Sequence, residues 1–294
     1  MVLENFEHKN VDDSHCSIDL LMKGDGLPLL LLHGFPETKL AWHKIASQLA
    51  EHYTLVIPDL PGYGDSTGPT VDDEHKNYSK RELANILVRI MQQLNFHQYS
   101  VVGHDRGGRI AYRMALDHPE IITRLALLDI IPALDMSERL DYDSAVTMEN
   151  WFFLSQPKPL PETLIAANPE FYLSYILDSW TAKPEMILPE IRAEYLRYFK
   201  NPKVITAICE EYRASYLDII YDKEDRLHDK RINCPVLLLW SAGDLAAKLG
   251  DPLAIWKSWA NNVTGKSLQC GHFLMEECPT EVLNQLLPFM EPNN

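Results

Sequence analysis

The 294-residue chain has few cysteines and no long hydrophobic run. Its five cysteines include no CxxC pair, so reduced thiols in a cytoplasmic protein are expected rather than disulfides or a zinc site. No stretch approaches the roughly 20 consecutive apolar residues of a membrane helix. Residues 1–13 are polar and acidic, whereas a signal peptide would be basic and then apolar. We therefore expect a cytoplasmic protein with no membrane partner.

Basic side chains are also scarce: 27 Lys and Arg stand against 42 Asp and Glu, for a formal net charge of −15. Nucleic acid needs a basic surface, so it is not expected as a partner. A small anionic substrate is still allowed, because charge is screened over roughly 8 Å at physiological salt and arginines inside a pocket can hold an anion. The length suits one large α/β domain, or such a domain with an insertion.

Short runs rich in Leu, Val and Ile alternate with stretches of helical spacing. Such an alternation predicts a mostly parallel sheet flanked by helices. The expected strands are Leu27 to Leu32, Thr54 to Leu60, Tyr99 to His104, Leu125 to Ile131, Pro235 to Trp240 and Lys266 to Cys270. The expected helices are Ala41 to Glu51, Lys80 to Leu94 and Arg106 to Asp117.

The alternation breaks between residues 132 and 231, where helix-like pieces such as Pro184 to Lys200 and Pro202 to Tyr216 appear without a convincing strand. We interpret residues 132–231 as a helical cap inserted into an α/β core formed by residues 1–131 and 232–294.

Gly103-His104-Asp105-Arg106-Gly107 directly follows an expected strand and opens a helix. This is the G-x-nucleophile-x-G elbow of α/β-hydrolases, with aspartate where esterases carry serine. Glycines flank the nucleophile because the turn is tight. An N-capping aspartate in an ordinary strand–turn–helix is the alternative. The partners below favour Asp105 as the nucleophile.

The remaining groups follow other strands in the chain order of this fold. His33-Gly34-Phe35-Pro36 would supply the Phe35 N–H to an oxyanion hole, together with the N–H of Arg106. His272, in Gly271-His272-Phe273, is the expected base. Its acid partner is either Asp129, at the end of a strand, or Asp244, in a loop, since each could orient the histidine.

An aspartate nucleophile changes the substrate class. A carboxylate that attacks an acyl group forms only a labile anhydride, whereas attack on saturated carbon displaces a leaving group and leaves an ester. His272 would then activate water against that ester. Alkyl halides and epoxides fit this route.

Arg106 and Arg109 lie three residues apart at the start of the helix after the elbow, hence on one face. Guanidinium groups beside a helix N-terminus suit a carboxylate, which indicates a small 2-halo acid as substrate. The alternative is that both arginines are solvated or pair with acids of the cap, as we expect for Arg113.

Several motifs together resemble the haloacetate dehalogenases, including the fluoroacetate dehalogenases, over nearly the whole chain. They are HGFPE (33–37), DLPGYGDS (59–66), GHDRGGRIAYRMALDHPE (103–120), LLDIIP (127–132) and CGHF (270–273). The resemblance implies an α/β-hydrolase fold with Asp105 displacing halide, Arg106 and Arg109 holding the carboxylate, and Asp129, in LLDIIP, supporting His272. It also implies no metal or organic cofactor and, by analogy alone, a homodimer.

In this family a His-Trp pair of the cap and a tyrosine stabilise the halide. Here the pair is Asn150-Trp151, and the tyrosine resembles Tyr212 in EEYRA. An indole N–H and a hydroxyl are suitable halide donors, although core packing is the commoner fate of aromatic residues. Asn150 is neutral and cannot bring a proton's charge to fluoride. We therefore expect chloride, bromide or iodide to be removed more readily than fluoride.

Two other functions stay open. An epoxide hydrolase would use Asp105 and His272 identically but would need cap tyrosines as acids, of which Tyr212 could be one. Arg106 argues against it, because similar epoxide hydrolases usually have tryptophan there. A ligand-binding relative without turnover would usually have a damaged triad, and this triad looks intact.

Overall fold

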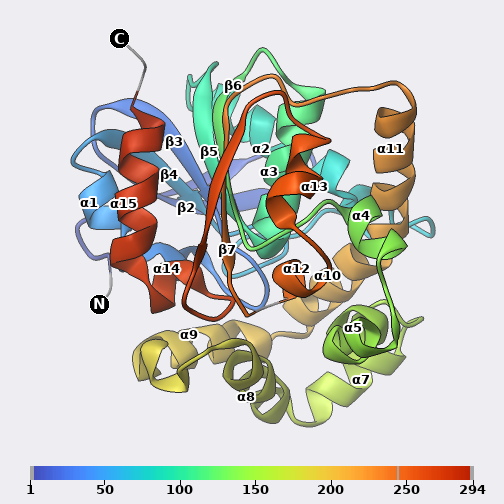
Figure 1. Cartoon of the computed structure of the whole chain (residues 1–294). Helices are drawn as coiled ribbons and strands as arrows, with labels where there is room; N and C mark the ends of the chain where they lie inside the picture. The colour runs from blue at the N-terminus through green and yellow to red at the C-terminus, as the bar shows by residue number, and fades with distance from the viewer. Residues whose placement is uncertain (1–2, 244, 292–294) are drawn as a thin grey trace.

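The computed structural model describes residues 3–243 and 245–291, and a mostly parallel sheet of eight strands forms its centre (Figure 1). The strand order is β1-β2-β4-β3-β5-β6-β7-β8. All strands from β4 to β8 in this order pair in parallel, whereas β1 and β2 form an antiparallel hairpin at one edge. The strands are β1 Glu7–Asp12, β2 Ser17–Lys23, β3 Leu27–Leu32, β4 Tyr53–Pro58, β5 Tyr99–His104, β6 Ile122–Leu128, β7 Val236–Ser241 and β8 Val263–Leu268. The expected α/β-hydrolase architecture is confirmed.

Each expected strand is present, shifted by no more than a few residues, but the hairpin of β1 and β2 was not expected from the sequence. The residues of β1 alternate between exposed and half-buried. Such an edge strand lacks the continuous apolar run that marks a strand covered on both faces. The inner strands β3 and β5 are buried at four or more of their six positions.

Helices cover both faces of the sheet (Figure 1). One apolar cluster includes residues of α2, α3 and α13, and the other includes residues of α1, α14 and α15. The core helices are η1 Lys39–Trp42, α1 Ala46–Leu49, η2 Lys76–Tyr78, α2 Lys80–Gln93, α3 Asp105–Asp117, α12 Leu245–Lys248, α13 Pro252–Lys257, α14 Leu274–Glu277 and α15 Pro279–Met290. The sheet is therefore buried on both sides, as its Leu- and Val-rich strands require.

Between β6 and β7 the described chain contains helices and one isolated β-bridge at Ile232 but no further strand, and we call residues 133–227 the helical insertion. Several of its helices lie together beyond one end of the sheet (Figure 1). They are α4 Ala133–Glu138, α5 Tyr142–Thr147, α6 Glu149–Leu154, α7 Leu160–Ala167, α8 Pro169–Trp180, η3 Pro184–Met186, α9 Pro189–Phe199, α10 Pro202–Arg213 and α11 Ser215–Leu227.

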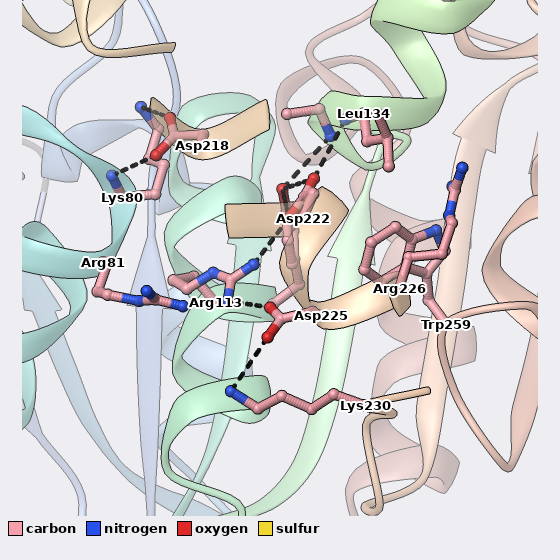
Figure 2. Close-up of polar contacts among 12 residues, drawn as sticks. Lys80, Arg81, Arg113, Leu134, Asp218, Asp222, Asp225, Arg226, Lys230 and Trp259 are labelled. Atoms are coloured by element: carbon pink, nitrogen blue, oxygen red, sulfur yellow. Dashed lines mark hydrogen bonds and ion pairs between the residues drawn. The ribbon is translucent and has the colours of Figure 1, made fainter. Parts of the chain in front are cut away.

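A buried polar cluster fastens both ends of the insertion to the core helix α3 (Figure 2). Arg113 of α3 donates from Nη2 to Asp222 of α11 at 2.7 Å and pairs through Nη1 with Asp225. Asp222 also accepts the N–H of Leu134, at the start of α4, at 3.1 Å. Burial raises the pKa of Asp222 to about 6 despite the adjacent Arg113. The expected pairing of Arg113 with acids of the cap is confirmed, and it places α4 and α11 directly on the helix that begins at Asp105.

No helix among the described residues is long and apolar enough to cross a membrane.

Candidate active site

Asp105 stands at the sharp turn between β5 and α3. Its φ of 44° lies in the left-handed region, which costs energy for a non-glycine residue. A Cβ on Gly107 would lie 2.3 Å from the backbone oxygen of His33, and one on Gly103 would lie 2.6 Å from that of Gly107. Only glycine fits these two positions, so the flanking glycines let the backbone bring Asp105 against the loop after β3.

That loop meets the Asp105 carboxylate with a backbone donor. The N–H of Phe35 donates to Asp105 Oδ2 at 3.0 Å. The N–H of Arg106 lies in the first turn of α3, where amides have no carbonyl partner within the helix. Burial alone would raise the pKa of Asp105, but His272, His104, Arg106 and the Phe35 N–H lower it below its usual value. The side chain is therefore an ionised carboxylate, as a nucleophile must be.

His272 and Asp129 form a hydrogen-bonded pair at the ends of β8 and β6. His272 Nδ1 lies 2.7 Å from Asp129 Oδ2. Asp129 has a φ of 54°, and its Oδ1 accepts the N–H of Ser241 at 3.0 Å. These contacts fix the carboxylate, and its bond to Nδ1 orients the imidazole ring. Asp244, the alternative acid, lies outside the described residues.

Three residues to which the sequence analysis gave no role hold His272 in place. His104 lies between Glu37 Oε2, 2.9 Å from its Nδ1, and the carbonyl of His272, 2.8 Å from its Nε2. The N–H of His272 donates to the carbonyl of Trp180 in α8 at 2.8 Å, and the two rings meet edge to face. Glu37 belongs to the HGFPE motif and His104 to the GHDRGG motif, which were the only sequence signals; nothing local marks Trp180.

Arg106 is engaged by an acid of the insertion. Its Nε donates to Glu211 Oε1 at 2.9 Å, and its guanidinium lies 4.0 Å from the ring centre of Tyr212. Lys80 also pairs with Glu211, and the Tyr63 hydroxyl donates to it at 2.7 Å. Burial would raise the pKa of Glu211, but Arg106 and Lys80 lower it to about 2. Both arginines were expected to hold a carboxylate ligand, yet Arg106 already has an acid partner within the protein.

Arg109 differs sharply from Arg106. It is only 5% exposed, and its Nε and Nη1 have no hydrogen-bond partner in the described part of the chain. Its Nη2 contacts Met136 Sδ at 3.4 Å, and its guanidinium lies 4.7 Å from the ring centre of Trp151. Burial lowers its pKa. A buried guanidinium without an acid is costly, and an anionic ligand would relieve that cost.

The residues expected at the halide are brought together by the insertion. The Asn150 amide donates to the Tyr212 hydroxyl at 3.2 Å. The rings of Trp151 and Tyr212 meet edge to face at 6.5 Å, and Tyr212 packs against Phe35 in the same way at 5.6 Å. Because Asn150 supplies the proton of this bond, the hydroxyl of Tyr212 keeps its own proton for another acceptor.

These groups surround one cavity of about 330 Å³ between the strand ends and the insertion. All of the expected site residues except Phe35 line it: Asp105, Arg106, Arg109, Asp129, Asn150, Trp151, Tyr212 and His272. The cavity therefore combines a carboxylate at a strand–helix elbow, a histidine paired with a second aspartate, and a guanidinium that has no acid partner among the described residues. Such a set can open a bond at saturated carbon and hydrolyse the resulting ester.

One cluster of acids outside this cavity has the spacing of a metal site. Asp19, Asp59 and Asp65 bring carboxylate oxygens within 4.8 Å of one another. The ammonium of Lys39 lies 2.6 Å from both Asp19 and Asp59. A cation of the protein thus already lies among these carboxylates and balances part of their charge. The expectation of a metal-free reaction remains a prediction.

Comparison with known proteins places this site in a family. Residues 28–279 match the family described as alpha/beta hydrolase fold. The chain is 37% identical to fluoroacetate dehalogenase from a Burkholderia species, over 98% of this chain and 95% of the relative. It is 31% identical to soluble epoxide hydrolase from Corynebacterium sp. strain C12, over 92% of both chains.

The fold comparison agrees. A crystal structure from Nostoc sp. PCC 7120, provisionally named an alpha/beta hydrolase, has a TM-score of 0.95 and 46% identity, covering 98% of this chain and 99% of that one. The expected family is confirmed, and the protein is a hydrolase. Its aspartate elbow, its histidine and its relatives agree: the chain belongs to the α/β-hydrolases of the fluoroacetate dehalogenase family.

Proposed function

We propose that the protein hydrolyses the carbon–halogen bond of small 2-halo acids such as chloroacetate. The observation that carries this proposal is Arg109, a buried guanidinium that has no acid partner among residues 3–243 and 245–291, in the cavity that holds Asp105. A substrate carboxylate would neutralise it. The dehalogenase among the relatives supports the same chemistry.

In the first step, an Asp105 carboxylate oxygen attacks the α-carbon of the substrate. The carbon–halogen bond breaks, the halide leaves with the electron pair, and a glycolyl ester of Asp105 remains. Trp151 and Tyr212 line the cavity and would donate to the departing halide.

In the second step, His272 Nε2 takes a proton from water, and the hydroxide attacks the ester carbonyl. Asp129, 2.7 Å from Nδ1, stabilises the imidazolium. The N–H groups of Phe35 and Arg106 would hold the oxyanion, since the Phe35 donor already lies 3.0 Å from Asp105 Oδ2. Collapse releases glycolate, regenerates Asp105 and leaves one proton for solvent.

The direct test is halide release from chloroacetate by the native protein and by Asp105→Asn. We expect release that vanishes in Asp105→Asn and persists in Asp229→Asn, a control that changes an exposed carboxylate. No release from the native protein would refute the proposal.

Halide preference is a second test. We propose that chloride, bromide and iodide leave more readily than fluoride, because Asn150 is neutral and its amide is engaged with Tyr212. Asn150→His should raise the ratio of fluoroacetate to chloroacetate turnover about tenfold, the effect of one charge-assisted hydrogen bond. Equal turnover of both acids by the native protein would contradict this preference.

Epoxide hydrolysis is the second candidate, favoured by the Corynebacterium relative and by the Tyr212 hydroxyl in the cavity. Arg109→Met distinguishes the two. Turnover of a neutral epoxide such as styrene oxide would survive the loss of this cation, whereas turnover of a halo acid would not. A bound small acid with no product from either substrate class would instead favour a binding protein.

A further inference from the structure

The cavity is larger than a haloacetate requires. Cavities of about 300–1,000 Å³ ordinarily hold ligands of drug size, and this one measures about 330 Å³. A two-carbon acid would leave much of that space unfilled. An unfilled apolar wall forfeits contacts, so the composition of the remaining wall indicates what it accommodates.

The reacting groups fix three directions around the attacked carbon. Asp105 approaches opposite the departing halide, which faces Trp151 and Tyr212, and the carboxylate lies at Arg109. The region beside His272, bounded by Trp180, has to hold the hydrolytic water. A further substituent on the attacked carbon must therefore use the wall that is left.

Most of that wall is formed by a buried apolar cluster separate from the two main cores, with Thr147 and Lys248 lining the cavity beside it. The members of the cluster come from the loop after β6, from α4, from the α5–α6 junction, from α12 and the residue that follows it, and from α13. Those that line the cavity are Ile131, Met136, Met148, Ala246 and Leu249, each no more than 7% exposed. We call these five residues the apolar wall. Methionine side chains adapt to ligands of varied shape, so two methionines suit an aliphatic group.

The apolar wall begins next to the carboxylate anchor. Met136 Sδ lies 3.4 Å from Arg109 Nη2, and Trp151, which stacks on Arg109, packs against the same cluster. An acid held at Arg109 would therefore bring a substituent of its α-carbon close to these side chains. Ionic and apolar contacts would be made by adjoining parts of one small molecule.

We propose that the preferred substrates are 2-halo acids whose α-carbon carries an apolar chain of several carbons, packed on the apolar wall. This inference rests on the proposed function and narrows its substrate class. The reaction is unchanged: an Asp105 oxygen forms a bond to the α-carbon as the halide leaves with its electrons. Water then cleaves the ester to give a 2-hydroxy acid and one proton.

The test compares single enantiomers of 2-chloropropanoate, 2-chlorobutanoate and 2-chlorohexanoate by halide release. All three are attacked at a secondary carbon, so chain length is the main variable. Each added methylene that becomes buried should raise kcat/KM about fourfold. A flat or falling series would overturn the inference. If chloroacetate and 2-chloropropanoate still released chloride through Asp105, the proposed function would stand; if no acid did, both would fall.

Variants test where the alkyl chain of the substrate lies within the cavity. Ala246→Leu fills the apolar wall and should lower the ratio of 2-chlorohexanoate to 2-chloropropanoate turnover about tenfold, since the longer acid loses its space. Ala166→Leu adds the same atoms at an exposed position of α7 and should keep the native ratio. An unchanged ratio in Ala246→Leu would overturn the assignment of this wall.

Binding provides a readout that does not depend on turnover or on Ala246→Leu folding well. Asp105→Asn can hold a halo acid without reacting, so calorimetry gives Kd directly. We expect 2-chlorohexanoate to bind about tenfold or more tightly than 2-chloropropanoate. Equal affinities would overturn the inference.

Discussion

The two sides of the cavity are held in place by different means. On the sheet side, backbone geometry positions the reacting groups: Asp105 and Asp129 both have left-handed φ angles, and the Phe35 N–H lies 3.0 Å from Asp105 Oδ2. On the insertion side, Trp151 and Tyr212 are positioned by ring packing and by contacts with arginine side chains. The two aspartates at the strand ends are thus positioned mainly by backbone geometry, and the aromatic residues of the insertion by side-chain packing.

A site built in this way can keep the groups at its strand ends while the side chains of the insertion change. The chain matches both a fluoroacetate dehalogenase and a soluble epoxide hydrolase over more than nine-tenths of its length. Strained turns tolerate few replacements, so the strand-end groups stay fixed. Side chains on packed helices can be exchanged with smaller effects on stability. Substitutions on one side, or at the boundary between the two, therefore should have different effects.

The largest effect is expected on the sheet side, from His272→Gln. Activity on chloroacetate should fall about 10⁴-fold or more, because ester hydrolysis loses its base. Mass spectrometry should show one glycolyl group accumulating on Asp105, since the first step does not need the histidine. His97→Gln, an exposed control, should behave as the native protein. If His272→Gln were inactive and formed no ester, His272 would also have to act before ester formation.

Arg109→Met should lower activity and raise stability. The kcat/KM for chloroacetate should fall about 100-fold or more, because a buried charge pair with the substrate is lost. The free energy of unfolding should rise in the same variant, since an uncompensated buried charge disappears.

The matched control is Arg231→Met, which removes a half-buried arginine outside the cavity. Halo acid turnover in Arg109→Met within threefold of native would remove the main support for a carboxylate substrate.

Glu211→Gln tests the ion pairs that join the two sides. It leaves Arg106 and Lys80 without their buried partner, which should lower the free energy of unfolding by about 3 kcal/mol in urea titrations. Glu194→Gln breaks the more exposed pair with Arg197 and should cost no more than about 1 kcal/mol. Similar costs for both variants would show that burial adds nothing to the Glu211 pairs.

The contact of Glu276 with the insertion should make the stability of the protein depend on pH. It lies on α14, and its Oε1 accepts the Tyr195 hydroxyl of the insertion at 2.8 Å. Burial, reinforced by Glu37, raises the pKa of Glu276 to about 8 from its usual 4.5. The folded protein therefore favours the protonated carboxyl. Its stabilising contribution is complete below pH 4.5 and is lost as pH rises through about 8.

Glu276→Gln should remove this loss, because the amide stays neutral and can still accept from Tyr195. Between about pH 6 and pH 9, the Tm of the native protein should fall more steeply than that of the variant. Over this range the free energy of unfolding of the native protein should fall by on the order of 1 kcal/mol more than that of the variant, the equivalent of one pKa unit. The exposed control Glu281→Gln should follow the native curve. Parallel curves for native protein and Glu276→Gln would contradict the raised pKa.

The sheet side could be predicted almost entirely from local sequence. The inner strands are marked by apolar runs, and Asp105 and Asp129 each follow such a run, whereas His272 follows the more polar edge strand β8 and was identified by its motif and chain order. The choice of Asp129 over Asp244 came from the family resemblance. Parallel strands end at one edge of a sheet, so residues after their carboxyl ends meet in space whatever the details of packing. Strand β1 was missed because its exposure alternates and its pairing depends on a neighbour that the pattern does not reveal.

The insertion side could be predicted only in part. The resemblance pointed to Asn150, Trp151 and Tyr212, and all three line the cavity. The contrast between Arg106 and Arg109 could not be predicted, since both lie on the same face of α3 and the sequence gives them equal claims. Glu211 contacts Arg106 from a helix more than a hundred residues away.

The sequence by itself determined the family and predicted the reacting roles of Asp105 and His272, because both rest on short motifs at strand ends and on their order along the chain. Only the tertiary structure decided that Arg106 pairs with Glu211, whereas Arg109 has no acid partner among the described residues. It also decided the size of the cavity beside Asp105. Both properties depend on which side chains of the insertion pack against α3 and α12. The sequence pattern of one segment does not reveal which distant segment packs against it.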